Sequence, residues 1–335
     1  MRGKMNEERV RMQSDGEFEE AVIVGGDGGL ADVIGLVELA ASTDSPALIT
    51  GETGTGKNLV AKAIHERSAA RREPFLCINC LSLPPENLAG AELFGYEKGA
   101  FTDVTAGRKG IFEMADRGTL FLDKIEEMPL PLQGMLLGLI DDKKVRRLGG
   151  DFERPVHARI IASSNGDIEK AVGSAFRKDL YYRLNAIRIH IPPLRNRRED
   201  VPALCSHLLK GMSGSRKVSL PYPELRKLME YDWPGNVREL KNVIGRAVLL
   251  QKGPELRPSE FLAKTDPREA APQNTALAGC PAGDDHLMTI SEIKNNQIEL
   301  ALQRFSGNRA KASEALGISA STLCRRMKGM VSRRA

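Results

Sequence analysis

One short glycine-rich stretch decides the fold of this 335-residue chain, and it reads Gly51-Glu52-Thr53-Gly54-Thr55-Gly56-Lys57. The spacing Gly-x4-Gly-Lys lets backbone N–H groups curl around an anion, because glycine accepts positive φ values and allows close approach. The apolar run 47–50 predicts a buried strand just before the stretch, and 59–67 predicts a helix just after it. A helix N-terminus adds partial positive charge there. The stretch therefore predicts a phosphate-binding loop.

The end of this loop indicates which ligand it holds. Lys57 is placed to reach the β- and γ-phosphates of a nucleotide, which predicts ATP as the ligand. Asn58 follows, where a Ser or Thr hydroxyl commonly contacts Mg²⁺. A chance glycine-lysine loop is the alternative, and the flanking strand and helix argue against it. The residues predicted to hold the cofactor from this loop are Gly51, Glu52, Thr53, Gly54, Thr55, Gly56, Lys57 and Asn58.

Composition narrows the class of protein. The chain is 41% hydrophobic and carries a net charge of +5, so it can build a large core and two or three domains. It shows no apolar run long enough to span a bilayer and no signal peptide, which predicts a cytoplasmic protein without a membrane partner. The pair Cys77 and Cys80 has CxxC spacing but lies in an apolar run, which favours buried structural thiols over metal or redox chemistry.

The pattern of apolar runs predicts the order of the domains. Between 21 and 195, such runs alternate with amphipathic stretches, which predicts an α/β subdomain with a parallel sheet covered by helices. A nucleotide binds at the carboxyl ends of such strands. The predicted strands are 47–50, 75–79, 119–123, 159–164 and 188–191. The other predicted segments are a flexible lead-in at 1–20, a helical subdomain at 196–262 with helices at 201–209, 223–231 and 236–250, a linker at 263–286, and a compact helical unit at 287–335.

A second nucleotide element ends the predicted strand 119–123. Asp123 provides a carboxylate that can hold Mg²⁺, directly or through water. Enzymes of this class usually follow that Asp with a Glu that activates the attacking water, but here Lys124 follows. A protonated lysine cannot act as a base, and losing a general base costs about 10²–10⁴-fold in rate. We expect the next acids, Glu126 and Glu127, to point away from the site, and rescue of hydrolysis by one of them is the alternative.

Six motifs together resemble one known family, the AAA+ domain of bacterial enhancer-binding proteins, which activate sigma-54-dependent transcription. The likeness extends from about residue 23 to 262. Its motifs are Gly51-Glu52-Thr53-Gly54-Thr55-Gly56-Lys57, Glu92-Leu93-Phe94-Gly95, Gly118-Thr119-Leu120-Phe121-Leu122-Asp123, Phe176-Arg177-Lys178-Asp179-Leu180-Tyr181-Tyr182-Arg183-Leu184, Pro192-Pro193-Leu194-Arg195 and Trp233-Pro234-Gly235-Asn236-Val237-Arg238-Glu239-Leu240. The resemblance implies a P-loop NTPase core with an all-helical lid, and a homo-oligomer, from dimer to hexameric ring, with ATP between subunits.

The resemblance also implies roles for single residues. Asn165 matches the position that senses the γ-phosphate, and Arg238 matches the sensor arginine of the lid. Arg177 and Arg183 match arginine fingers, which reach into the neighbouring subunit's site. Asn79 matches the residue that restrains the catalytic Glu, a role that Lys124 makes doubtful. Surface ion pairing is the alternative for the arginines.

A further motif concerns the partner protein. Members of this family contact sigma-54 RNA polymerase with a loop that reads Gly-Ala-Phe-Thr-Gly-Ala, and here the same place reads Gly99-Ala100-Phe101-Thr102-Asp103-Val104. Gly99, Ala100, Phe101 and Thr102 are therefore the predicted contact residues. Asp103 adds a charge and stiffens the backbone where glycine is usual, so contact with sigma-54 stays an open prediction.

The carboxyl-terminal segment predicts a DNA-binding unit. An amphipathic stretch at 290–305 is followed by Asn308, which can cap a short helix, and by Ser319, which can cap a last helix after the turn at Gly317. Two short helices joined by a glycine-containing turn form a helix-turn-helix, whose second helix enters the major groove of double-stranded DNA. Basic residues outnumber acids eight to one from Arg304 onward, and they are Arg304, Arg309, Lys311, Arg325, Arg326, Lys328, Arg333 and Arg334.

This segment resembles the Fis-type DNA-binding domain that ends most members of the family. The likeness lies in Gly307-Asn308-Arg309-Ala310-Lys311-Ala312-Ser313 and Leu316-Gly317-Ile318-Ser319. Arg309, Lys311 and Lys328 are predicted to meet phosphates, whereas Ser321, Arg325 and Arg326 are predicted to lie near base edges. The alternative is a generic three-helix interaction module.

These features favour a DNA-binding regulator of the sigma-54 type with an ATP-binding AAA+ domain and weakened hydrolysis. Two alternatives remain: an AAA+ ATPase that remodels a different protein, with the carboxyl-terminal unit as adaptor, and a regulator that binds no nucleotide. The lead-in at 1–20 is too short for a sensory domain, so we expect control to come from other molecules or from expression level.

Overall fold

The computed structural model of the chain describes residues 11–12, 22–25, 28–100, 106–166, 168–212, 218–251, 253 and 255–262. The chain divides into two compact units, Met1–Lys264 and Thr265–Ala335. The predictions for Phe101 and Thr102, for the linker at 263–286 and for the unit at 287–335 lie outside the described residues. The same holds for the predicted DNA contacts Arg309, Lys311, Ser321, Arg325, Arg326 and Lys328.

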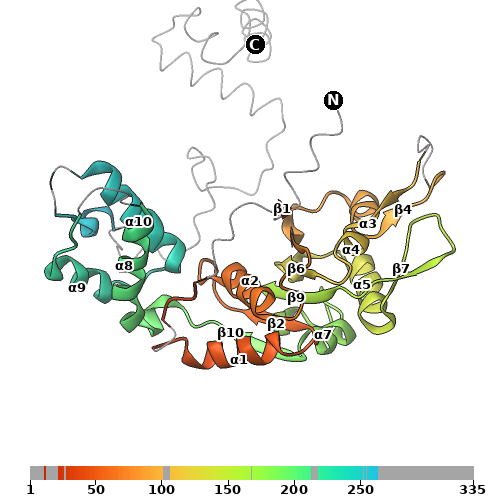
Figure 1. The fold of residues 1–335 in the computed structure, drawn as a ribbon, viewed down its shortest axis with the longest axis horizontal. Coiled ribbons are helices and arrows are strands. Elements are labelled where there is room, and N and C mark those ends of the chain that lie inside the picture. The colour runs from red at the N-terminus through yellow and green to blue at the C-terminus, as the bar shows by residue number, and fades with distance from the viewer. Residues whose placement is uncertain are drawn as a thin grey trace, which may run out of the picture. The chain divides into compact units, whose positions relative to one another are not determined.

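A six-stranded sheet with the order β1-β3-β6-β9-β2-β10 forms the centre of the first unit (Figure 1). Its five main strands are parallel, as the sequence predicts, so the α/β P-loop fold class is confirmed. They are β2 (Ala47–Thr50), β3 (Phe75–Asn79), β6 (Thr119–Asp123), β9 (Arg159–Ser164) and β10 (Ile187–His190). The strand before the phosphate loop, β2, lies between β9 and β10, so the loop emerges from the middle of the sheet.

The sheet edge at β3 differs from the prediction. Arg11 and Met12 form a two-residue strand, β1, that pairs antiparallel with Leu76 and Cys77, inside the segment predicted to be a flexible lead-in. The unpaired backbone groups of an edge strand accept any extended segment, whatever its side chains. No apolar pattern in the sequence signals such a short pairing.

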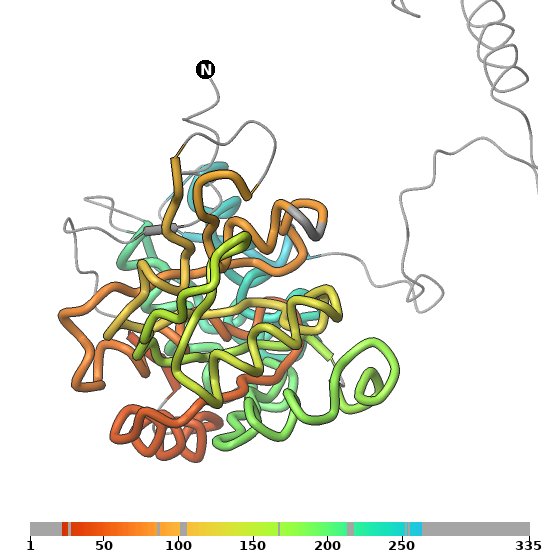
Figure 2. The backbone as a smooth tube through the Cα atoms, turned by 90° about the vertical axis from the view of Figure 1, so that its right-hand side faces the viewer, coloured from red at the N-terminus to blue at the C-terminus, as the bar shows by residue number. Residues whose placement is uncertain are grey.

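Helices cover both faces of the sheet, because successive strand residues point to opposite sides. Ile49, Phe121 and Ile161 pack with α1 and α2 on one face, whereas Leu48 and Leu120 join the core of the other face. The helices of the first face are α1 (Ala31–Ala41) and α2 (Lys57–Arg67). Those of the second are α3 (Glu86–Phe94), α4 (Ile111–Met114), α5 (Leu130–Asp142), α6 (Ile168–Ala171) and α7 (Lys178–Leu184). Helix α1 lies at the periphery of the layer in Figure 1 and in the turned view of Figure 2.

A separate helical core follows the sheet layer. Its helices are α8 (Val201–Met212), α9 (Tyr222–Glu230) and α10 (Asn236–Leu250), and Figure 1 shows them grouped together. Trp233 lies fully buried among them, and its indole N–H donates to the carbonyl of Leu228 at 2.8 Å. The predicted all-helical lid is therefore present, and α10 has the bounds that the sequence predicts.

Two short hairpins project from the sheet layer, and the sequence predicts neither of them. The first joins β4 (Gly95–Tyr96) to β5 (Arg108–Lys109), and the second joins β7 (Lys144–Arg146) to β8 (Glu153–Pro155). Strands of two or three residues are too short to show an alternating pattern. Backbone hydrogen bonds between Leu148 and both Gly95 and Glu97, at 2.9 and 3.0 Å, join the two hairpins.

Candidate nucleotide site

The loop after β2 has the geometry of a phosphate cradle. Its backbone turns at three glycines with positive φ, of 153° at Gly51, 84° at Gly54 and 109° at Gly56. At Gly54 glycine is required twice over, because a Cβ there would also lie 2.4 Å from the carbonyl oxygen of Gly235. Helix α2 begins directly after Gly56, so its free N–H groups and its partial positive charge face the loop.

Lys57 is held inside the loop. Its ammonium donates to the carbonyl oxygens of Gly51 at 2.7 Å and Glu52 at 3.0 Å, and to Oδ1 of Asn165 at 2.7 Å. Burial lowers the pKa of Lys57, and the nearby charges of Asp123 and Glu126 act against that shift. The lysine after β2 and the predicted sensor after β9 therefore meet at one point, where the γ-phosphate of a nucleotide would lie.

Asp123 ends β6 at the same edge of the sheet. Its Oδ1 accepts a hydrogen bond from the hydroxyl of Ser163 at 2.5 Å, which leaves the second carboxylate oxygen for a cation. A half-buried carboxylate beside a phosphate cradle suits Mg²⁺, which binds through one or two carboxylates, water and phosphate oxygens. The residues present fit the ion that the fold implies. The sequence analysis did not single out Ser163. The available signal was a hydroxyl one residue before the end of the predicted strand 159–164.

Lys124 starts a tight turn immediately after Asp123. Its backbone is left-handed, with φ 56° and ψ 56°, and its N–H donates weakly to the Ser163 hydroxyl at 3.4 Å. Within the described residues no ion pair joins its ammonium to Asp123. Its positive charge acts to lower the pKa of Lys57, which places the two ammonium groups in electrostatic reach of each other.

The position of Glu126 corrects a sequence prediction. We expected both acids after Lys124 to point away, but Oε1 of Glu126 accepts the backbone N–H of Asn165 at 3.0 Å. The turn at Lys124 and the 3₁₀ helix Ile125–Glu127 fold the chain back toward the end of β9, which a straight continuation of the strand would not do. Glu127 is exposed, as expected.

Asn79 lies beside this turn without contacting it through a described hydrogen bond. It is the register partner of Asp123 across β3 and β6, and its Oδ1 accepts the N–H of Leu81 at 3.1 Å. Its side chain therefore caps its own turn. Nearby Cys80 is buried, as predicted for a structural thiol, and burial raises its pKa far above the ordinary value.

The lid contacts the loop through Arg195 and Asn236, to which the sequence analysis assigned no role. Both oxygens of Glu52 accept from the Arg195 guanidinium, at 2.5 and 2.8 Å, and these bonds lower the pKa of Glu52. Asn236 donates to Oε2 of Glu52 and to the carbonyl of Thr53, each at 3.1 Å. Both Arg195 and Asn236 stand inside motifs of the sequence, which was the available signal.

Two further contacts bind the lid to the loop. The backbone N–H of Arg238 donates to the carbonyl of Gly54 at 3.3 Å, and the Arg238 charge acts on Lys57. Arg197, fully buried, donates to the carbonyl of Thr55 at 3.0 Å and lies 3.9 Å from Asp200. The predicted lid sensor is thus brought to the phosphate loop.

The predicted arginine fingers, Arg177 and Arg183, are exposed, and neither has a described contact with Lys57. Arg177 pairs with Asp179, with nitrogen–oxygen distances of 3.1 and 2.7 Å, and Arg183 pairs with Asp141 at 2.6 Å. Arg177, Asp179 and Tyr182 line a surface pocket of about 480 Å³. Neither arginine has a described contact with its own chain's loop.

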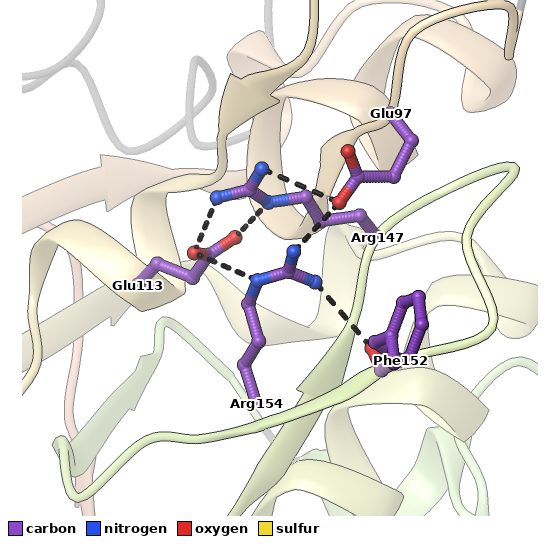
Figure 3. A network of polar contacts seen from close by, with 5 residues as sticks. All are labelled: Glu97, Glu113, Arg147, Phe152 and Arg154. Carbon is purple, nitrogen blue, oxygen red and sulfur yellow. Dashed lines mark hydrogen bonds and ion pairs between the residues drawn. The ribbon is translucent and has the colours of Figure 1, made fainter.

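A four-membered ion cluster ties the two hairpins together (Figure 3). Arg147 donates to both oxygens of Glu113, at 2.6 and 2.8 Å, and lies 3.4 Å from Glu97. Arg154 donates to the same oxygen of Glu97 at 2.8 Å. These charges fix the base of the segment that begins with Gly99 and Ala100, while Phe152 beside them is 77% exposed.

Comparison with known families agrees with this geometry. Residues 23–190 match the sigma-54 interaction domain, residues 195–277 match the AAA+ ATPase lid domain, and residues 289–329 match the bacterial regulatory proteins of the Fis family. The chain belongs to the sigma-54 activator family. The AAA+ core, the lid and the Fis-type helix-turn-helix predicted from the sequence are therefore confirmed.

Two relatives of this chain are named as regulators of transcription. The transcriptional regulatory protein FlbD of Caulobacter vibrioides is 40% identical over 323 residues, which cover 92% of this chain and 70% of FlbD. The DNA-binding transcriptional activator HyfR of Escherichia coli is 47% identical over 231 residues, covering 68% of this chain. The chain spans 34% of the length of HyfR.

Solved structures of NtrX from Brucella abortus share the fold of this chain. The complex with ADP aligns with a TM-score of 0.65 and 29% identity over 93% of this chain and 69% of NtrX. The complex with ATP aligns with a TM-score of 0.64 over 92% of this chain. In the described part of the chain, no helix is long and apolar enough to cross a bilayer, and no cluster of side chains suits a metal held by protein ligands alone.

Proposed function

We propose that this chain is a DNA-binding regulator of sigma-54-dependent transcription, which binds ATP at the loop after β2 and hydrolyses it slowly. The observation that supports ATP most directly is the meeting of Lys57 with Asn165 at the head of a glycine cradle. Those two side chains come from neighbouring strands and converge where a γ-phosphate fits. The NtrX structures with ADP and ATP support the same ligand class.

Binding follows from the geometry of the loop and lid. Amide groups of 51–58 surround the phosphates, Lys57 neutralises their charge, and Arg238 approaches from the lid. Asp123 would hold Mg²⁺, which neutralises charge that develops on the phosphate oxygens. Ser163 orients Asp123 for that task through the 2.5 Å hydrogen bond.

Hydrolysis requires a base that Lys124 does not provide. An attacking water loses a proton as its oxygen bonds to the γ-phosphorus, and an ammonium has no lone pair to accept that proton. Its positive charge also competes with Lys57 for the anionic groups of the site. We therefore infer turnover below that of a site with a carboxylate at this position.

Assembly into a homo-oligomer completes the site. Arg177 and Arg183 are exposed and engage only acidic neighbours on their own surface among the described residues, so an adjacent subunit's phosphates can compete for them. Solvent screens exposed pairs of this kind, so they hold the arginines weakly, whereas a triphosphate offers several charged acceptors.

Two further regions of the chain contact its proposed partners, RNA polymerase and DNA. The ion cluster of Glu97, Glu113, Arg147 and Arg154 holds the base of the segment 99–102, which we assign to contact with sigma-54 RNA polymerase. The Fis-type match at 289–329 supports binding to double-stranded DNA, with Arg309, Lys311 and Lys328 on phosphates and Ser321, Arg325 and Arg326 near base edges.

One experiment tests this proposal as a whole. ATP turnover and nucleotide-dependent retention of sigma-54–RNA polymerase on target DNA are measured for the full chain and for Lys57→Ala. The proposal predicts slow turnover and retention that both depend on Lys57. Retention of a different protein instead of sigma-54 would favour the remodelling alternative, and absence of ATP binding in calorimetry would contradict the nucleotide function.

A further inference from the structure

The turn after β6 brings a second carboxylate to the nucleotide site. The left-handed backbone of Lys124 reverses the chain, and the 3₁₀ helix Ile125–Glu127 presents Glu126 to the end of β9. Oε1 of Glu126 accepts the N–H of Asn165 at 3.0 Å. The same asparagine accepts the Lys57 ammonium through Oδ1 at 2.7 Å. Glu126 is therefore joined to the lysine of the phosphate loop through a single residue.

The second carboxylate oxygen of Glu126, Oε2, accepts no hydrogen bond from any described residue. Oε2 is buried, although burying a carboxylate oxygen without a donor is unfavourable. The negative charge of Glu126 acts directly on Lys57. An oxygen placed beside the γ-phosphate position and lacking a donor is the acceptor that an ordered water needs.

No described neighbouring side chain can act as the base instead. Lys124 is a cation, Asp123 already accepts from Ser163 and faces the predicted cation, and Glu127 is exposed. We propose that Glu126 is the catalytic base of this site, replacing the missing carboxylate at position 124. This inference rests on the proposed ATP hydrolysis and explains how turnover, although slowed, persists.

The step balances without any further reagent. The water oxygen bonds to the γ-phosphorus while the bond from that phosphorus to the bridging oxygen breaks, and the bonding pair leaves with ADP. The water proton passes to Oε2 of Glu126, which later releases it to solvent or to the inorganic phosphate. Oε1 stays bonded to the Asn165 N–H throughout, so the base and the predicted γ-phosphate sensor stay in fixed register.

A double-mutant cycle tests this role in the full-length protein. The variants are Glu126→Gln, Lys124→Glu and the double variant, with Glu127→Gln as the matched control on the adjacent exposed position. Glutamine keeps an oxygen for the Asn165 N–H but does not accept a proton. We expect Glu126→Gln to lower kcat by about 10-fold or more, with KM and ATP affinity unchanged. Glu127→Gln should match the wild type.

The cycle separates a base from a positioning residue. When Lys124→Glu supplies a carboxylate at the other position, the Glu126→Gln change should cost less than about 3-fold, because the base is then redundant. An equal loss in both backgrounds would overturn the proposal and assign Glu126 to holding Asn165. An unchanged kcat in Glu126→Gln would also overturn it.

Failure of the base and failure of the proposed function give different results. A wild-type chain that binds ATP in calorimetry but turns none over would end the role of Glu126 as base and leave nucleotide binding intact. A chain that binds no ATP would contradict the proposed function itself, and the role of Glu126 with it.

Discussion

The phosphate loop and the turn after β6 lie at the same edge of the sheet but are built in opposite ways. Loop 51–57 is tied by Arg195, Arg197 and Asn236 to the lid, and its backbone has the positive φ values that favour glycine at positions 51, 54 and 56. At the turn, the charges of Lys124 and Glu126 both act on Lys57, and in the described part neither joins an ion pair.

This difference separates binding from turnover. Steric conditions at the loop are strict, because a single added Cβ at Gly54 would collide with the lid backbone. Conditions at the turn are looser, because the side chain of Lys124 is partly exposed and no hydrogen bond or ion pair of its ammonium is described. Substitutions at the turn can therefore change the rate of ATP hydrolysis while nucleotide binding is kept.

The strongest way to break this comparison is to remove the lysine of the loop. Lys57→Ala deletes a buried charged donor with three acceptors, and hydrogen bonds to charged groups contribute about 1.5–3 kcal/mol each. We expect ATP binding about 100-fold weaker by calorimetry. Lys62→Ala on the same helix, where the side chain pairs with Glu66, serves as the control and should bind ATP normally. Equal affinity in both variants would contradict a phosphate role for Lys57.

Restoring a carboxylate at the turn tests the other side of the comparison. Lys124→Glu should raise kcat for ATP hydrolysis by about 10-fold, because it supplies a base and removes a competing cation. ATP affinity should change far less. The control Lys124→Met removes the cation without adding a base. A gain in Lys124→Met equal to that in Lys124→Glu would show that the positive charge, and not the missing base, limits the rate.

The sequence predicts the loop side well because its constraints are local. The strand, glycines and helix of the loop lie within about twenty consecutive residues, and four of the five parallel strands have the predicted bounds, with β10 displaced by one residue. The central strands β2, β6 and β9 are buried on both faces, so each appears as a largely apolar run in the sequence. The parallel fold follows from those runs.

The turn side was not predictable in the same way. The return of Glu126 depends on a left-handed residue at Lys124, and non-glycine residues adopt that conformation rarely and without a sequence signature. The Glu52–Arg195 pair joins positions 143 residues apart, and the ion cluster of the hairpins joins positions up to 57 apart. The charges in the sequence do not indicate which acidic and basic side chains form ion pairs.

The ion cluster under the partner loop provides a test on stability. Glu113→Gln leaves the mostly buried guanidinium of Arg147 with a longer contact to Glu97, and we expect a loss of about 2 kcal/mol in unfolding free energy. Denaturant unfolding measures it. Glu153→Gln in the exposed β7–β8 pair is the control and should leave stability close to that of the wild type.

Lowering the pH should remove the same contribution to the unfolding free energy from the wild-type protein. Burial acts to raise the pKa of Glu113, but its hydrogen bonds and ion pair with Arg147 outweigh burial and lower it. A lowered folded pKa contributes stability above the ordinary value of 4.5, and that stability disappears as the pH falls through the folded pKa. The difference between wild type and Glu113→Gln should therefore shrink below about pH 4.5. A constant difference across that range would contradict the ion pair.

The smallest expected effect concerns the grip of the lid on the loop. Arg195→Met removes the two bonds to Glu52, but both side chains are about 40% exposed, and exposed pairs contribute about 0–1 kcal/mol. ATP affinity should fall by no more than about 5-fold, and the loss should fade in high salt because screening already weakens the pair. Arg226→Met is the control, since Arg226 is also exposed and pairs with Glu230 within α9. A 100-fold loss in Arg195→Met alone would mean that the lid, and not the glycine cradle, sets nucleotide affinity, which would reverse the distinction between a strict loop and a permissive turn.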